Sequence, residues 1–320
     1  MGKRVSPPLT GTDHLVPIAD FNDSESVSDI QFLIPNPAGL RGKLGKLLRE
    51  GVESIEILAD FDQTISRYRH NGQVCPSSHR ILQLSGLFST DFETEVNRLY
   101  KHYHTIEADP DLDYDIKYKE MDAWWDITHG MIVEQLDLMD FMLPEMLKNS
   151  NLALRHGVDS VLERCKDFDV PFTVVSAGIG NFVEAALHPL INYPGFHIFS
   201  NFLHFDLDGH VQGFSKPNIH SLSKSAVLRD QIQRPNAVLL GDMPTDTLMV
   251  QGNKYQEVLS IGFLNDPTAC LEDYRSSFDI LVLGDGNFDL VHHLLSYLHN
   301  DQQAHTPHFL PDLLNLPALV

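Results

Sequence analysis

The sequence has few cysteines and no long apolar run. Its three cysteines, Cys75, Cys165 and Cys270, are widely spaced and form no Cys-x-x-Cys pair. This spacing argues against a disulfide framework and against a zinc site, and it fits a reducing compartment. No apolar run approaches the roughly 20 residues that span a bilayer, and the N-terminus lacks the apolar core of a secretory signal. We therefore expect a cytoplasmic protein.

Basic residues are also scarce. The sequence has 23 lysines and arginines but 44 acidic residues, which gives a formal net charge of −21. An acidic surface repels nucleic acid and anionic membranes, so neither is an expected general partner. It also repels phosphate esters, so a site for them would need a metal ion and a lysine to become locally positive. Residues 1–6 match the loose pattern for myristoylation at Gly2, although one acyl chain gives only weak, reversible membrane binding.

Short apolar runs separated by helical segments make up most of the chain. Runs typical of buried strands lie at residues 55–59, 172–175, 237–240, 258–263 and 280–283. This alternation predicts an α/β fold with a doubly wound parallel sheet, in which ligands bind at the carboxyl ends of the strands. Residues 77–163 show helical periodicity without a strand signal, which indicates an inserted helical domain.

The length of 320 residues exceeds the usual single core and is consistent with a core that carries an insertion. We assign residues 41–76 and 164–299 to the core and residues 77–163 to a helical cap. Residues 1–40, rich in Pro, Ser, Asp and Gly, are predicted to be a flexible extension. Residues 300–320 form a C-terminal tail to which the sequence assigns no role.

Two carboxylates, Asp60 and Asp62, directly follow the run at 55–59. Because unpaired buried charges are costly, two acidic residues at the end of a buried strand indicate a site. Asp60 is predicted to attack phosphorus and form an aspartyl-phosphate, and Asp62 to protonate the leaving alkoxide and then activate water. The alternative is a turn or a helix N-cap, where aspartate is common.

Two later strand ends carry further polar residues. The run at 172–175 leads to Ser176 and Gly178, where the backbone and a helix N-terminus could approach phosphate. The run at 237–240 leads to Asp242 and Asp246, which with Asp60 would offer hard oxygen ligands to Mg²⁺. The ordinary alternatives are a strand-to-helix turn and an Asp-rich turn.

The lysine that the charge argument requires should lie between these strand ends, and Lys216 and Lys224 are the only lysines from residue 181 to residue 253. Each signal is modest by itself. Their order along the chain is Asp-x-Asp-x-Thr, strand-Ser, Lys and Gly-Asp-x-x-x-Asp, and this order argues against coincidence.

This order resembles the haloacid dehalogenase superfamily, and the detail is similar to the cytosolic 5′-nucleotidase III family, which includes pyrimidine-specific and 7-methylguanosine-monophosphate-specific nucleotidases. The resemblance covers residues 45–298, and its main stretches are ADFDQTISRY (59–68), NGQVCPSSH (71–79), WWDITHG (124–130), VVSAGIG (174–180) and LLGDMPTD (239–246). It implies a haloacid-dehalogenase-like core with Mg²⁺ as cofactor and a helical cap that selects the nucleoside.

The resemblance also implies roles for single residues. Asp60 would be the nucleophile and a Mg²⁺ ligand, and Asp62 the general acid/base that ligates Mg²⁺ through its backbone carbonyl. Ser176 would bind phosphate. Asp242 would ligate Mg²⁺, with Asp246 supporting the site.

The catalytic lysine of the family matches Lys224. However, the usual Gly-Phe-Lys-Gly reads Gly-Phe-Ser-Lys at residues 213–216, which leaves Lys216 as a rival. In the cap, Glu107 matches a glutamate that reads the base edge, and Thr128 takes a small hydroxyl position in the same pocket. At position 125 this sequence has Trp, as the methylguanosine-preferring members of the family do. An indole stacks well on a cationic methylated purine.

We therefore interpret the chain as a Mg²⁺-dependent 5′-nucleotidase that acts on nucleoside 5′-monophosphates, namely pyrimidine nucleotides such as CMP and UMP, 7-methyl-GMP, or both. It is expected to be a monomer. The alternatives are a phosphatase of the same type for another small phosphate ester, and a non-catalytic nucleotide-binding protein.

Overall fold

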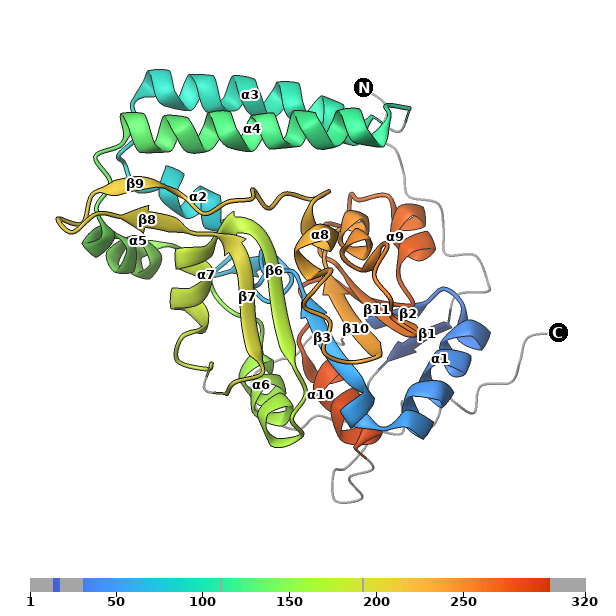
Figure 1. Cartoon of the computed structure of the whole chain (residues 1–320). Coiled ribbons are helices and arrows are strands. Elements are labelled where there is room, and N and C mark those ends of the chain that lie inside the picture. The colour runs from blue at the N-terminus through green and yellow to red at the C-terminus, as the bar shows by residue number, and fades with distance from the viewer. Residues whose placement is uncertain (1–13, 18–30, 110, 192, 300–320) are drawn as a thin grey trace.

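The computed structural model describes residues 14–17, 31–109, 111–191 and 193–299 (Figure 1). Its centre is an eight-stranded sheet with the order β1-β2-β12-β11-β10-β3-β6-β7. The bounds are β1 His14–Pro17, β2 Gln31–Ile34, β3 Ile55–Ala59, β6 Phe172–Ile179, β7 Phe196–Asn201, β10 Asn236–Gly241, β11 Glu257–Leu264 and β12 Ile280–Leu283. Neighbouring strands from β12 to β7 pair parallel, whereas β1 and β2 pair antiparallel. The predicted parallel α/β sheet is thus confirmed.

Helices cover both faces of this sheet. One face packs on α1 (Pro37–Glu50), α6 (Val158–Asp167), α7 (Gly180–Leu187) and α10 (Asp289–Leu298), and the other on α8 (Lys224–Leu228), the 3₁₀ segment η3 (Pro244–Val250) and α9 (Leu271–Ser277). In β3, Ile57 points to the first cluster and Leu58 to the second, and both are fully buried. Because strand side chains alternate between faces, an apolar run of this kind is stable only when both faces are covered.

A layer of helices lies over the carboxyl ends of the parallel strands, with the long pair α3 (Thr90–Ala108) and α4 (Tyr114–Gln135) outermost (Figure 1). Beneath this pair lie α2 (Ser78–Gln83), α5 (Leu143–Asn149) and the hairpin of β8 (Leu203–Phe205) and β9 (Val211–Phe214). The remaining elements are the short ribbon of β4 (Arg69–His70) and β5 (Gln73–Val74) and the 3₁₀ turns η1 (Val52–Ser54) and η2 (Asp140–Met142). We call α3 and α4 the cap.

The structure differs from the sequence-based boundaries in three places. Strand β2 and the start of α1 lie within residues 31–40, so the predicted flexible extension is wrong for this part of the chain. For residues 1–13 and 18–30, with the Gly2 acylation pattern, the extension stays a prediction, because they lie outside the described residues, as does the tail at 300–320. Helix α6 begins in the segment assigned to the cap but packs in the sheet core, where its Val161 is fully buried. The β8–β9 hairpin was not predicted.

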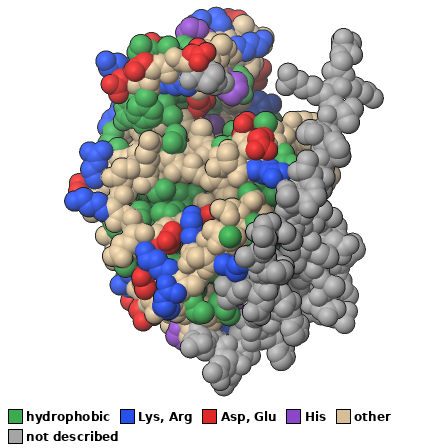
Figure 2. Space-filling view, turned by 90° about the vertical axis from the view of Figure 1, so that its right-hand side faces the viewer, with side chains coloured by type: hydrophobic (Ala, Val, Ile, Leu, Met, Phe, Trp, Pro, Cys, Tyr) green, Lys and Arg blue, Asp and Glu red, His purple; other side chains and the backbone are tan. Residues whose placement is uncertain are grey.

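Acidic and basic side chains are interspersed over the described part of the face shown in Figure 2. The excess of negative charge is therefore not gathered into one block there. Within the residues that the structure describes, no helix combines the length and the apolar character needed to cross a bilayer.

Candidate active site

The carboxyl ends of β3, β6 and β10 meet below the cap, and the predicted core residues gather there. Asp60 directly follows β3 and is 7% exposed. The Nζ of Lys224, the first residue of α8, donates to Asp60 Oδ1 at 2.6 Å and to Asp246 Oδ1 at 2.8 Å. Lys224 itself is buried. The structure thus brings the lysine and two of the predicted carboxylates into one buried cluster.

A third carboxylate, Asp242, completes this cluster at the end of β10. Ligand oxygens of Asp60, Asp242 and Asp246 lie within 4.8 Å of one another. The Asp246 Oδ2 atom accepts the backbone N–H groups of Asp242 at 3.1 Å and Met243 at 3.0 Å, which fixes the loop. Three carboxylates beside one ammonium leave an excess of negative charge, and hard oxygens grouped in this way fit a divalent cation such as Mg²⁺.

The pKa values in this cluster show the cost of burying like charges. Burial raises the pKa of Asp60 to about 7, although Lys224 acts in the opposite direction. The pKa of Asp242 is well above its ordinary value, because of burial first and then the charges of Asp246 and Asp60. Burial lowers the pKa of Lys224, but Asp246 and Asp60 outweigh it and hold the pKa above its usual range, so the ammonium stays charged.

Asp62 lies beside the cluster and is held by Ser78 at the start of α2. Both Ser78 groups donate to it, the backbone N–H to Oδ1 and the hydroxyl to Oδ2, each at 2.9 Å. Burial raises the pKa of Asp62 to about 6 in spite of these hydrogen bonds. A carboxyl of fixed orientation and raised pKa has the properties of a general acid/base.

Ser176 and Gly178 lie on β6 where its pairing with β7 loses register between Val175 and Ile179. The Gly178 N–H donates to the buried Ser176 Oγ at 3.1 Å. A Cβ atom at Gly178 would lie 1.8 Å from the Ser78 Oγ and 3.1 Å from an Asp62 oxygen. Only glycine therefore fits here, and the backbone comes close to the acid/base carboxylate.

The two candidate lysines lie in different places. Lys224 contacts Asp60, as described above. Lys216 instead pairs with Asp126 of α4, and its side chain is 59% exposed. The geometry thus puts Lys224, and not Lys216, at the predicted nucleophile.

Trp125 reaches from α4 to the core. Its Nε1 donates to the Ala177 carbonyl at 3.4 Å, and its ring meets the His79 ring edge-on at 6.2 Å. The neighbouring Trp124 stacks instead on Tyr103 within the cap at 5.6 Å. One indole therefore packs the cap, while the other lies directly beside the predicted phosphate loop.

The other two cap candidates lie on α3 and α4. Glu107, near the end of α3, accepts the Ser221 hydroxyl at 2.5 Å, so it contacts the core and is not a freely solvated carboxylate. The Thr128 Oγ1 atom is buried, and none of the residues that the structure describes makes a hydrogen bond to it. Buried polar atoms need partners.

Sequence reasoning missed two residues that build this site. Ser78 orients Asp62, and nothing in a serine after a proline turn distinguishes such a role. Arg155 is 2% exposed and donates to the Gln63 and Thr64 carbonyls, at 2.6 and 2.7 Å. It also donates to the Asn265 side chain at 2.6 Å. Arg155 thereby ties the loop after Asp60 to the end of β11.

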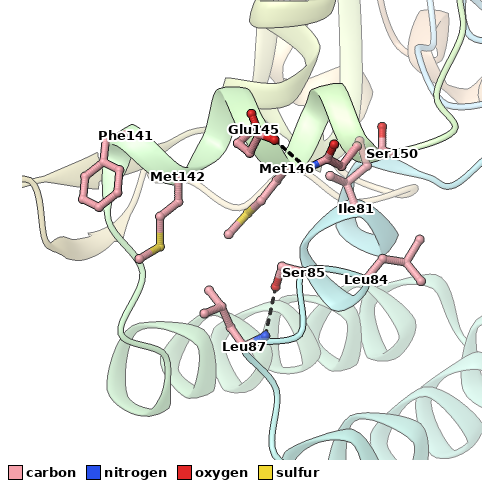
Figure 3. Close-up of a pocket in the computed structure, with 10 residues that line it drawn as sticks. Ile81, Leu84, Ser85, Leu87, Phe141, Met142, Glu145, Met146 and Ser150 are labelled. Carbon is pink, nitrogen blue, oxygen red and sulfur yellow. Dashed lines mark hydrogen bonds between the residues drawn. The ribbon is translucent and has the colours of Figure 1, made fainter.

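A separate concavity of about 530 Å³ lies between α2 and α5. The side chains of Leu87, Phe141, Met142 and Met146 border it (Figure 3). Glu145 is its one titratable lining residue among those described. Its described lining residues include no lysine and no cluster of carboxylates, unlike the strand ends.

The fold is of the haloacid-dehalogenase type. A haloacid dehalogenase family hydrolase from Salmonella enterica shares the fold, with a TM-score of 0.51 at 16% identity over 79% of this chain and 74% of that one. The crystal structure of cytosolic 5′-nucleotidase IIIB bound to cytidine gives a TM-score of 0.74 at 28% identity, over 84% of this chain and 94% of that one.

Sequence comparison gives the family. The profile of the Pyrimidine 5′-nucleotidase (UMPH-1) family matches residues 63–299. The 7-methylguanosine phosphate-specific 5′-nucleotidase of Mus musculus is 33% identical over 86% of this chain and 96% of its own length, and that of Homo sapiens is 32% identical over 83% and 92%. The chain belongs to the pyrimidine 5′-nucleotidase family and is an enzyme of the 5′-nucleotidase class, which confirms the predicted family and enzyme type.

Proposed function

We propose that the chain is a Mg²⁺-dependent 5′-nucleotidase whose nucleophile is Asp60. The observation that carries this proposal is the position of the Asp60 carboxylate, at the end of β3 and in contact with Lys224, with Asp242 and Asp246 beside it. Two residues further on, Asp62 is held by Ser78. The proposed nucleophile, its lysine and the proposed acid/base therefore lie close together, which supports this division of roles.

The residues of the chain divide the reaction between them. An oxygen of Asp60 attacks phosphorus and forms an aspartyl-phosphate, while Asp62 donates a proton to the departing 5′ oxygen. Asp62 then takes a proton from the water that hydrolyses the intermediate. Lys224, Ser176 and the Gly178 amide hold the phosphoryl oxygens and balance their charge.

Asp60, Asp242 and the backbone carbonyl of Asp62 would hold Mg²⁺, with Asp246 orienting the loop. When bound, the ion would supply positive charge against the phosphoryl oxygens. This requirement agrees with the excess of carboxylates over lysine in the cluster. Lys216 has no part in this scheme.

We propose pyrimidine nucleoside monophosphates and 7-methyl-GMP as the substrates. Trp125 would stack on the base, Glu107 would accept its N–H groups, and the hydroxyl of Thr128 would find its partner in the same pocket. The names of the relatives support both bases, since one acts on 7-methylguanosine phosphate and another was solved with cytidine.

Phosphate release from UMP, CMP, AMP, GMP and 7-methyl-GMP, with Mg²⁺ and with EDTA, tests this proposal. We expect Mg²⁺-dependent release from CMP, UMP or 7-methyl-GMP, well above AMP and GMP. Release from all five nucleotides at equal rates would refute the base selectivity, and release that survives EDTA would refute the metal requirement.

A further inference from the structure

Residues 218–223, all buried except the half-buried Ser221, connect the cap to the catalytic lysine. This segment follows the β8–β9 hairpin and ends directly before Lys224. Asn201, at the end of β7, accepts the Ile219 N–H at 2.9 Å and donates to the Ile219 carbonyl at 2.8 Å. The Asn201 amide also donates to the Ala177 carbonyl at 2.8 Å. The segment is therefore fixed to the phosphate loop at one side and to the lysine at its end.

Side-chain contacts join this segment to the cap. Among them are Tyr114 Oη to the Leu222 carbonyl at 2.9 Å, Asn218 Nδ2 to Asp126 Oδ1 at 2.7 Å, His220 Nε2 to Asp122 Oδ1 at 3.4 Å and Ser221 Oγ to Glu107 Oε1 at 2.5 Å. Three of these contacts go to α4. The Ser221 contact goes to α3, and it ends on the carboxylate that we assign to the base.

The hydrogen bond from Ser221 limits how the Glu107 carboxylate can turn. A hydroxyl that donates to Oε1 leaves Oε2 to accept an N–H group. On the same helix, His104 Nδ1 lies 3.6 Å from Oε2 but is 55% exposed, so it is a weak competitor in solvent. The backbone of Glu107 is held as well, because Lys117 donates to its carbonyl at 3.2 Å.

We propose that Ser221 is a positioning residue for base recognition, which holds the Glu107 carboxylate at a fixed place relative to Lys224. One rigid segment then sets both ends of the substrate site, the base at Glu107 and the phosphate at Lys224. The inference rests on the proposed function, in which Glu107 binds the base. If the contact instead only held the cap on the core, its loss would affect every substrate alike.

Two substrates separate these cases, a nucleotide and p-nitrophenyl phosphate, which has the phosphate group but no nucleoside. We expect Ser221→Ala to raise KM for the better of CMP and 7-methyl-GMP about tenfold with kcat little changed, because one hydrogen bond to a charged group is lost. Hydrolysis of p-nitrophenyl phosphate should stay unchanged, and Ser221→Thr, which keeps the hydroxyl, should restore most of the nucleotide KM.

Tyr114→Phe is the matched control, because it removes a hydrogen bond between the cap and the same segment without touching Glu107. We expect Tyr114→Phe to change kcat/KM by the same factor for both substrates. If Ser221→Ala lowered kcat/KM equally for both substrates, or left the nucleotide KM unchanged, the proposal would be overturned.

A double-mutant cycle with Glu107→Ala, which removes the acceptor of the Ser221 hydroxyl, tests whether Ser221 acts through Glu107. In that background Ser221→Ala should add no further loss, and independent, additive losses would contradict the assigned route.

Calorimetric titration with cytidine and 7-methylguanosine distinguishes failure of this inference from failure of the proposed function. If no nucleotide is hydrolysed but Ser221→Ala weakens nucleoside binding about tenfold, the proposed function fails and the positioning role stands. If nucleotides are hydrolysed and Ser221→Ala binds nucleosides as the wild type does, the positioning role fails alone. If no nucleotide is hydrolysed and the wild type binds no nucleoside, both fail.

Discussion

The two ends of the proposed substrate site are built differently. At the phosphate end, Asp60, Lys224 and Asp246 are almost fully buried, and the Lys224 ammonium donates to both carboxylates. At the base end, Glu107 and Trp125 are partly exposed and come from helices of the cap. The first arrangement suits chemistry that must be the same for every substrate, and the second suits selection, which has to differ between substrates.

The largest effect is expected at the phosphate end. Asp60→Asn should lower phosphate release roughly 10⁴-fold or more on every substrate, since the nucleophile is lost. Lys224 keeps Asp246 as a partner, so the thermal midpoint should change by only a few degrees. Steady-state assays and a melting curve check both parts, and substantial turnover by the variant would contradict the assigned nucleophile.

Metal removal should act on the same end. EDTA is expected to reduce turnover by at least about 10³-fold, because several kcal/mol of charge stabilisation disappear. Mg²⁺ should also raise the thermal midpoint of the wild type, since it binds only the folded cluster. The Asp242→Asn variant should lose this rise, and a rise of equal size in that variant would exclude Asp242 as a ligand.

Ser78→Ala should have an intermediate effect. Without its hydroxyl the Asp62 carboxylate keeps only the backbone hydrogen bond, and a misplaced acid/base costs about 10- to 100-fold in kcat. The loss should be the same for CMP and 7-methyl-GMP, as expected at the phosphate end. A change in the ratio of the two rates would place Ser78 in base selection instead.

The smallest effect is expected at the base end. Trp125→Tyr should lower kcat/KM for 7-methyl-GMP relative to CMP by about 2- to 10-fold, because a phenol ring stacks less well than an indole on a cationic base. Competition between the two nucleotides measures this ratio directly. An unchanged ratio would remove Trp125 from the account of specificity.

The contrast between the phosphate end and the base end also explains which site residues could be predicted from the sequence. Asp60 and Asp242 were found because each follows a continuous apolar run, and strand ends of a parallel sheet meet at one edge. The sequence could not choose between Lys216 and Lys224, because both lie between the same two strands and only the tertiary contact with Asp60 separates them. The cap residues Glu107 and Trp125 came from resemblance alone.

Other features had no local signal. The hydroxyl and backbone of Ser78 act on a carboxylate 16 positions earlier in the chain. Arg155 joins segments that are about 90 and 110 positions away. The β8–β9 hairpin is made of strands too short for an alternating pattern to stand out, and β2 lies in a segment whose composition resembles a linker. Long-range contacts, and not local propensity, decided the roles of Ser78 and Arg155 and the pairing of β2 with β12.

Mass spectrometry of acid-quenched enzyme tests the central claim most directly. Asp62→Asn should still be phosphorylated by p-nitrophenyl phosphate, whose good leaving group needs no acid, but it should hydrolyse the intermediate slowly because the base is missing. We expect a phosphoryl group on the peptide that contains Asp60, and none when Asp60→Asn is added. A phosphoryl group on another residue, or none on the single variant while it still releases p-nitrophenol, would contradict Asp60 as the nucleophile.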